Sequence, residues 1–230
     1  MKVDYIHHCG SDLTTVNAAR VSFDKESKWE VDYLPTGNDG VGGIGIEEYE
    51  IDVLSEADIK LTKYLADHEH TSPFNHSFIT MRVKAPIFVA RQLVKHKFMP
   101  WNEVSRRYVD SEPEFYEPEV WRKKAKDKKQ GSSEEEFHHT DLVWLNNHVK
   151  GLRTIYLKLL KEGCCPEQAR MVLPQSMYTE WYWSGTLGAW LDMLKLRLKE
   201  DTQWETREVA KMCAKIIQPL FPVAYEARLK

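Results

Sequence analysis

The sequence predicts a single α+β domain, with a mixed sheet and several packed helices, over residues 1–230. The length allows one substantial hydrophobic core, and no Gly/Ser- or Pro-rich linker divides the 230 residues into two units. Helical periodicity is more frequent along the chain than the alternation typical of strands. The two patterns also do not alternate regularly, which disfavours a doubly wound parallel sheet.

Two helices are predicted in the first third of the chain. A serine can cap the first, over residues 11–19, and residues 20–23 then have the composition of a strand. A capping-box pattern formed by Ser55 and Asp58 predicts the second helix, which we expect to end near residue 68.

A glycine-rich insertion separates these two helices, near residues 29–54. Gly40, Gly42 and Gly45 form a literal G-x-G-x-x-G, the spacing of dinucleotide-binding turns. That motif requires a helix directly after the glycines, and no helical pattern follows here. A loop or hairpin is therefore the favoured interpretation.

The middle of the chain is predicted to contain a strand, a helix and a charged excursion. Residues 79–84 alternate between apolar and polar side chains, as in a half-buried strand. Pro86 suits the first turn of an apolar helix that should end before Pro100. Residues near 121–139 change from basic to acidic with almost no apolar period, so we interpret them as a solvated excursion without chemistry of its own.

Three helices are predicted in the remainder of the chain. The first spans about residues 140–163 and ends at a glycine. The second spans residues 187–198, where leucines repeat at helical spacing. The third spans about residues 202–217, and Thr202 with Glu205 has the pattern of a capping box.

The composition favours a cytoplasmic protein with a small ligand. The formal net charge is -3, so the bulk charge gives no attraction to a nucleic-acid polymer or an anionic membrane. The 4 cysteines form neither a disulfide framework nor a C-x-x-C pair, which is typical of a reducing compartment. No apolar run approaches the ~20 residues that a membrane-spanning helix needs.

The densest polar chemistry lies in residues 91–108. Two pairs, Arg91 with Lys95 and Gln92 with His96, are four positions apart, so each pair projects from one surface of the predicted helix. In the loop that follows, a glutamate, a serine and an arginine occupy alternate positions and would face one side of an extended segment. Such a cluster could hold a phosphate by charge and read a base or ribose by hydrogen bonds. The alternative is a basic surface helix with a solvated loop.

Two further arginines interrupt apolar patterns. Arg197 lies beside the leucine stripe of its predicted helix, and Arg170 lies within an otherwise apolar run. An arginine in such a position either extends to water or pairs with a buried anion. The residues alone leave both possibilities open.

Histidines and cysteines give weaker indications of a site. His68, His70 and His76 could be metal ligands, but no established metal-ligand spacing accompanies them, so we expect no metal. Cys164 and Cys165 could include a nucleophile, but the neighbouring chain offers no histidine base. The start of a helix is the simpler interpretation of the cysteine pair.

Several blocks of the sequence resemble the flavin-dependent thymidylate synthase family. Lys95-His96-Lys97, followed by seven residues and Ser105, is similar to the family's R-H-R-x7-S signature, with lysine in place of two arginines. Residues 70–76, His-Thr-Ser-Pro-Phe-Asn-His, resemble its H-E-T-P-F-E-H block. The other similar blocks are residues 18–22, 83–92, 169–174, 196–197 and 203–205. The resemblance therefore covers most of the chain.

Carried over position by position, the resemblance implies a dUMP site and a flavin site that share residues. Around dUMP it places the polar side chains of Gln92, Lys95, Glu103, Ser105, Arg106, Arg107 and Arg170. Around FAD it places Ser72, Lys95, His96, Lys97, Glu103, Thr186, Leu187, Gly188 and Asp192. Arg197 would be the catalytic residue, which contacts the uracil ring and favours ionisation of its N3.

The implied reaction converts dUMP to dTMP, with 5,10-methylenetetrahydrofolate as carbon donor and FAD, reduced by NADPH, as hydride source. The resemblance also implies a homotetramer with shared active sites, in which a neighbouring subunit supplies residues 103–107. Thr186 and Gly188 depart from the family's Asn and Arg, so one cationic contact to FAD is missing. The alternatives are a flavin- or nucleotide-binding homologue without turnover and, more distantly, a metal-dependent hydrolase.

Overall fold

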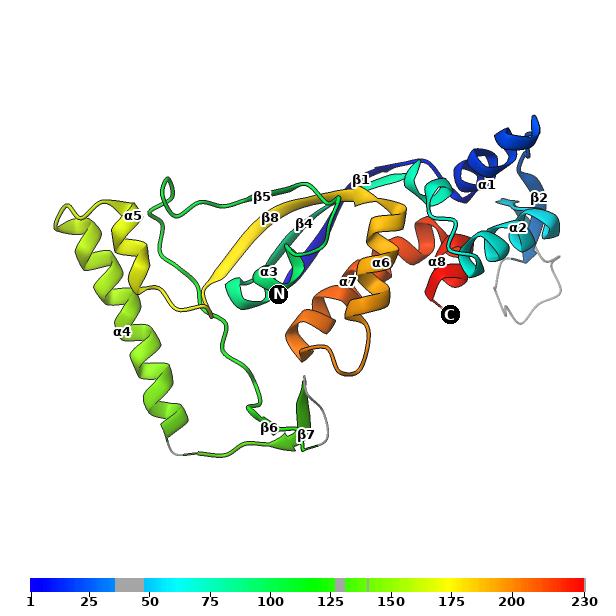
Figure 1. The fold of residues 1–230 in the computed structure, drawn as a ribbon. Coiled ribbons are helices and arrows are strands. Elements are labelled where there is room, and N and C mark those ends of the chain that lie inside the picture. Colours follow the sequence, from blue (N-terminus) through cyan, green and yellow to red (C-terminus); the bar gives the residue numbers. More distant parts are fainter. Residues whose placement is uncertain (36–47, 127–130, 140, 230) are drawn as a thin grey trace, which may run out of the picture.

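The computed structural model confirms an α+β fold, built on one central sheet and several helices (Figure 1). It describes residues 1–35, 48–126, 131–139 and 141–229. The helices are α1 (Asp12–Arg20), α2 (Glu56–Asp67), α3 (Ile87–Leu93), α4 (Asp141–Lys161), α5 (Pro166–Ala169), α6 (Leu187–Arg197), α7 (Trp204–Leu220) and α8 (Pro222–Leu229). The short 3-10 segments are η1 (Val21–Phe23), η2 (Ser72–Asn75) and η3 (Arg170–Val172). Within the described ranges, no helix is long and apolar enough to cross a membrane.

The central sheet is antiparallel, so the prediction of a mixed sheet was wrong. Its strands are β1 (Lys2–Cys9), β4 (Phe78–Pro86), β8 (Tyr178–Thr186) and β5 (Trp101–Glu103). They lie in the order β1-β4-β8-β5, and each neighbouring pair runs antiparallel. The alternation of apolar residues identifies a strand but carries no information about the direction of its partners.

The register of β4 and β8 determines where two important helices begin. Pro86, at the end of β4, pairs with Tyr178, and Thr186, at the end of β8, pairs with Phe78. α3 follows β4 and α6 follows β8, so the two helices begin at opposite ends of the strand pair. Both lie on the same side of the sheet in Figure 1, where they run back toward each other.

The hydrophobic core lies between this sheet and α3, α6, α7 and α8. Its largest fully buried side chains include Trp181 and Trp183 from β8 and Trp190 from α6. The Nε1 of Trp190 donates a hydrogen bond to the carbonyl oxygen of Ile79 at 3.1 Å, which satisfies the indole inside the core. These contacts fix α6 rigidly against the sheet.

Residues 20–23 do not form the predicted strand. Arg20 is the last residue of α1, and the 3-10 segment η1 follows it. The guanidinium of Arg20 binds the carboxylate of Asp58 in α2, which is almost fully buried. Val21 and Phe23 are exposed, so they lack the burial of strand residues, and an ion pair between two helices holds the end of α1.

The two ends of the glycine-rich insertion are strands that pair as a hairpin, as predicted. β2 (Glu30–Pro35) pairs antiparallel with β3 (Glu48–Val53). Gly40, Gly42 and Gly45 lie outside the described residues. The next predicted helix is confirmed as α2, where the hydroxyl of Ser55 accepts a hydrogen bond from the Asp58 N–H at 3.2 Å.

The charged excursion is more ordered than the sequence indicated. Its strands β6 (Arg122–Lys124) and β7 (Ser132–Glu136) form a second hairpin. Arg122 pairs with Glu205, whose side chain is only 5% exposed. Glu205 is therefore not part of the predicted capping box, and the N-cap of α7 is Gln203, without a side-chain cap. A charge pattern shows that a segment is polar but not which of its charges has a buried partner.

The long helix α4 is confirmed, and it stands away from the core (Figure 1). Of its side chains only Tyr156 is buried, whereas Val143, Trp144 and Ile155 are exposed. Gly163 follows it at φ +90, the left-handed conformation that ends a helix most easily when no Cβ is present.

Candidate active site

The carboxyl-terminal ends of α3 and α6 meet at Arg197. Its Nε donates to Nε2 of His96, and its Nη2 donates to the carbonyl oxygen of Gln92, both at 3.0 Å. The side chain is half-buried, so neutral acceptors hold the arginine at the edge of the core. These bonds use two of the five N–H groups of the guanidinium, and the others can donate to a ligand.

His96 is a neutral acceptor beside this arginine. Burial lowers its pKa, and the charge of Arg197 lowers it further, to about 4, although Asp192 acts in the opposite direction. The imidazole is therefore uncharged near pH 7, and because Nε2 accepts a hydrogen bond, the proton lies on Nδ1. Burial also lowers the pKa of Arg197, which stays charged because a guanidinium retains its proton in proteins.

A cavity of about 560 Å³, the α6 cavity, lies at the start of α6. Its lining residues are Thr71, Asn75, His96, Lys97, Phe98, Thr186, Gly188, Ala189 and Asp192. The cavity thus collects most of the residues predicted to bind FAD. Phe98, which also lines the cavity but was not predicted from the sequence, is an exposed aromatic with a left-handed backbone at φ 61.

The departures at Thr186 and Gly188 are part of one local arrangement. Thr186 caps α6 by accepting a hydrogen bond from the Ala189 N–H, and its hydroxyl donates to Oδ1 of Asn75 at 2.7 Å. A Cβ added at Gly188 would lie 2.5 Å from the same oxygen. A larger side chain at 188 would therefore displace Asn75 and break its bond with Thr186.

The other residues predicted to bind FAD occupy different environments. Ser72 lies in η2, between two residues that line the α6 cavity. Leu187 is fully buried in the core, so any contact with a flavin would come from its backbone. Lys95 is exposed just after α3. Asp192 is held by an ion pair with Arg228 of α8.

A second cavity, of about 440 Å³, collects most of the residues predicted to bind dUMP. This loop cavity is lined by Ile87, Glu103, Val104, Ser105, Arg106, Arg107, Arg170, Leu173, Met177 and Thr179. The Thr179 hydroxyl and the Trp101 indole N–H donate to the two carboxylate oxygens of Glu103 at 2.6 and 2.9 Å. Arg107 and Arg170 bring two positive charges to the same cavity, which suits an anionic ligand.

The two cavities are far apart on one chain. Thr179 lines the loop cavity and Thr186 lines the α6 cavity, and both belong to β8. These two threonines lie about 23 Å apart along the extended strand, and the two cavities have no lining residue in common. Gln92, Lys95 and Arg197 do not line the loop cavity. One chain therefore keeps the two groups of predicted residues apart.

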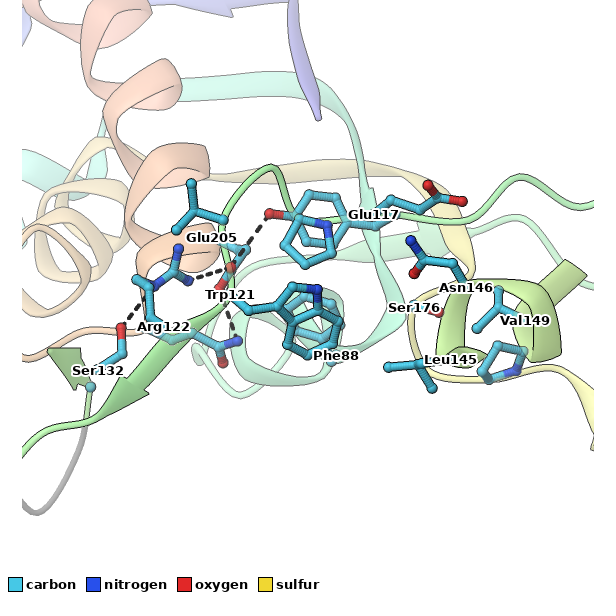
Figure 2. A pocket seen from close by; sticks show the side chains of 16 residues that line it. Phe88, Glu117, Trp121, Arg122, Ser132, Leu145, Asn146, Val149, Ser176 and Glu205 are labelled. Atoms are coloured by element: carbon cyan, nitrogen blue, oxygen red, sulfur yellow. Dashed lines mark hydrogen bonds and ion pairs between the residues drawn. The ribbon is translucent and has the colours of Figure 1, made fainter. Parts of the chain in front are cut away.

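A third cavity, of about 670 Å³, was not predicted from the sequence. This hairpin cavity lies between the β6–β7 hairpin, α4 and the start of α7 (Figure 2). Phe88, Trp121, Leu145 and Val149 give it apolar walls, and Glu205 forms its polar end. The family-like block at residues 203–205 was the sequence feature that could have indicated this cavity, because Gln203 and Glu205 line it.

The histidines and cysteines were considered above as metal ligands and as a nucleophile, and those described next have structural contacts instead. His68 and His70 pack around the ring of Tyr64. Among the residues that the structure describes, no three His, Cys, Asp or Glu side chains are grouped to hold a metal ion. Cys165 is the N-cap of α5, which confirms the predicted helix start.

Comparison with solved structures identifies the class of protein. Two crystal structures of the UMP/dUMP methylase PolB from Streptomyces cacaoi, bound with 5-Br dUMP and 5-Br UMP, match with TM-scores of 0.76 and 0.75. The matches cover 98% of this chain and 93% and 92% of theirs, at 29% and 27% identity. With the sequence relatives below, this fold places the chain among the methyltransferase enzymes.

Sequence comparisons then identify the family. The family model described as thymidylate synthase complementing protein matches residues 4–223. The flavin-dependent thymidylate synthase of Thermus thermophilus is 38% identical over 98% of this chain and 74% of its own length. The enzymes of Thermotoga neapolitana and Thermosipho melanesiensis are 35% and 34% identical, over 99% and 96% of this chain and 90% and 87% of theirs. The chain belongs to the flavin-dependent thymidylate synthase family.

Proposed function

We propose that this enzyme converts dUMP to dTMP, with 5,10-methylenetetrahydrofolate as the carbon donor and FAD, reduced by NADPH, as the hydride source. The observation that carries the proposal is the separation of the family's binding residues into two cavities, one suited to a flavin and one to a nucleotide phosphate. Family membership supports the flavin, and the nucleotide bound in the matched PolB structures supports a uridine nucleotide as substrate.

The α6 cavity fits a flavin dinucleotide in its chemistry. Lys97 and the amino end of the 11-residue helix α6 provide positive charge for a pyrophosphate. Gly188 leaves the backbone of α6 open, and Asn75, Thr186 and Asp192 supply polar groups. A bound flavin would supply the hydride that reduces the transferred one-carbon unit to a methyl group.

The loop cavity fits the phosphate and sugar of dUMP. Arg107 and Arg170 would pair with the phosphate, and Ser105 and Glu103 would offer hydrogen bonds. A hydride donor must approach its acceptor to about 3–3.5 Å, so a flavin and a uracil held by these two groups of residues must meet at one site. The loop cavity of one subunit would face the α6 cavity and Arg197 of another, in the homotetramer with shared sites that the family resemblance implies.

Arg197 would act on the uracil ring. Its bonds to His96 and Gln92 fix the guanidinium before substrate binds, so its remaining N–H groups are preorganised for negative charge that develops on the ring. Because His96 is neutral, it orients the arginine without adding a competing positive charge. The cysteines have no part in this proposal.

Release of tritium from 5-tritiated dUMP, with methylenetetrahydrofolate and NADPH present, tests the proposed reaction. The unaltered enzyme should release tritium and copurify with flavin, whereas Arg197→Ala should lose a hundredfold or more of its turnover but retain flavin. Lys195→Ala, on the exposed face of the same helix, is the matched control and should keep full turnover. A flavin-loaded protein that releases no tritium would instead favour the binding homologue without turnover.

A further inference from the structure

A chain of hydrogen bonds links the hairpin cavity to Gln92. Glu205 is 4% exposed and accepts hydrogen bonds from Arg122 Nη2 at 2.5 Å and from Tyr116 at 3.4 Å. Its other carboxylate oxygen accepts from Nε2 of Gln203 at 3.0 Å, and Oε1 of Gln203 accepts from Nε2 of Gln92 at 2.5 Å. Figure 2 shows the bonds that converge on Glu205.

The chemistry of a carboxylate gives this chain of bonds one direction. Glu205 is paired with a permanently charged guanidinium, so it is ionised and can only accept hydrogen bonds. Gln203 must then direct its NH2 group toward Glu205 and its oxygen toward Gln92. Gln92 must in turn donate its NH2 group, which also lies 3.4 Å from the carbonyl oxygen of Phe88.

The position of Gln92 connects this network to the proposed active site. Its backbone carbonyl accepts the hydrogen bond from Arg197, so the residue that receives the network also holds the proposed catalytic arginine. With its NH2 group engaged by Gln203 and Phe88, Gln92 has its Oε1 left as the side-chain atom that these bonds do not use. An amide oxygen only accepts, so it selects a hydroxyl or ring N–H and disfavours another acceptor.

We infer that Glu205 is a positioning residue, which acts through Gln203 to make Gln92 present its amide oxygen to a donor group of the substrate. The inference rests on the proposed function, because that function provides the substrate, dUMP, whose donor groups are a sugar hydroxyl and the uracil N3–H. Without the carboxylate, Gln203 and Gln92 can each rotate by 180° about the terminal torsion, and in half of all the resulting combinations Gln92 directs its NH2 group at the substrate donor.

Calorimetric titration of the purified, flavin-loaded protein with dUMP tests the inference. Glu205→Gln should weaken dUMP binding about tenfold, and in turnover its KM should rise by a similar factor with kcat changed less than twofold. Gln203→Met interrupts the hydrogen-bond network between Glu205 and Gln92 and leaves the Arg122–Glu205 ion pair intact. It should therefore weaken dUMP binding equally, even if Glu205→Gln folds poorly. Tyr116→Phe removes only the long bond to Glu205 and should bind dUMP within about twofold of the unaltered protein.

A double-substitution cycle separates positioning from general destabilisation. In a Gln92→Leu background, adding Glu205→Gln should cause no further loss of dUMP affinity, because the group that it orients is absent. An additive loss, or unchanged affinity in both Glu205→Gln and Gln203→Met, would overturn the inference while the proposed function stands. Failure of the unaltered protein to bind dUMP would refute the proposed substrate and, with it, this role of Glu205.

Discussion

The proposed sharing of active sites between subunits predicts that two inactive variants restore activity when they assemble together in the proposed tetramer. Arg107 lies in the loop cavity, and Arg197 lies at the carboxyl-terminal end of α6. If each site takes one arginine from each of two subunits, Arg107→Ala and Arg197→Ala are nearly inactive alone. Mixed subunits can still assemble sites that contain both arginines.

The structure indicates that both variants fold. The Arg107 side chain is 45% exposed and its partners are exposed, so its loss should change stability by about 0.5 kcal/mol or less. Arg197 loses two hydrogen bonds to neutral acceptors, a cost of roughly 1–3 kcal/mol. Neither loss approaches the ~5–15 kcal/mol that separates a native protein from its unfolded state.

Random reassembly gives the expected fraction. When equal amounts are unfolded together and refolded, a site receives an intact Arg107 with a chance of about one half and an intact Arg197 with the same chance, so about a quarter of sites are complete. In the control mixture, Arg197→Ala with the exposed variant Lys60→Ala, about half of the sites should be complete. Tritium release measures both fractions. Mixtures no more active than the separate variants, with subunit exchange confirmed by mass spectrometry, would place both arginines in one chain's site and refute the reasoning.

Three further predictions follow from the buried titratable groups. Burial alone would raise the pKa of Asp58, but hydrogen bonds from Arg20 and two serines lower it. The stabilising effect of the Asp58 carboxylate is therefore present above pH ~4 and is lost as the pH falls through the lowered pKa. Asp58→Asn should therefore cost about 3 kcal/mol in urea unfolding at pH 7 and show a flatter loss of stability in acid; equal acid slopes would contradict this. The pKa of His96, about 4, should rise part of the way toward 6.5 in Arg197→Ala, as followed by imidazole NMR, because burial, the larger cause, remains; a value still near 4 would mean that the charge of Arg197 has no effect on it. Burial raises the pKa of the Cys213 thiol to about 12, so Cys213→Ala, with serine at the other three cysteines, should retain turnover; a folded but inactive variant would show that a thiol is needed.

The sequence was sufficient for the elements with strong local signals. The α+β class, α2 with its Ser55 cap, the start of α3 after Pro86, and α4 with its glycine stop all depend on interactions within a few residues. The same is true of the basic cluster after residue 90, whose spacing carried the family resemblance. The residues that determine these features are close together in the sequence, so a single sequence can indicate them.

The structure was needed wherever a partner is distant in the chain. The antiparallel order of the sheet, the 3-10 segment after Arg20 and the attachment of the charged excursion to α7 each depend on pairing across 38 or more positions, as in Arg20 with Asp58 and Arg122 with Glu205. Local patterns leave such pairings open, because a charge or an apolar stripe fits many partners equally well.

The candidate site shows both contributions together. The sequence indicated which side chains could bind anions and where this chain departs from the family pattern, at Thr186 and Gly188. Only the tertiary structure decided that the loop cavity and the α6 cavity lie toward opposite ends of β8, and that Gln92 donates to Gln203, which in turn donates to Glu205. The physical reason is that residue type sets what a group can bind, whereas the register of β4 on β8 and the packing of α7 set which groups meet.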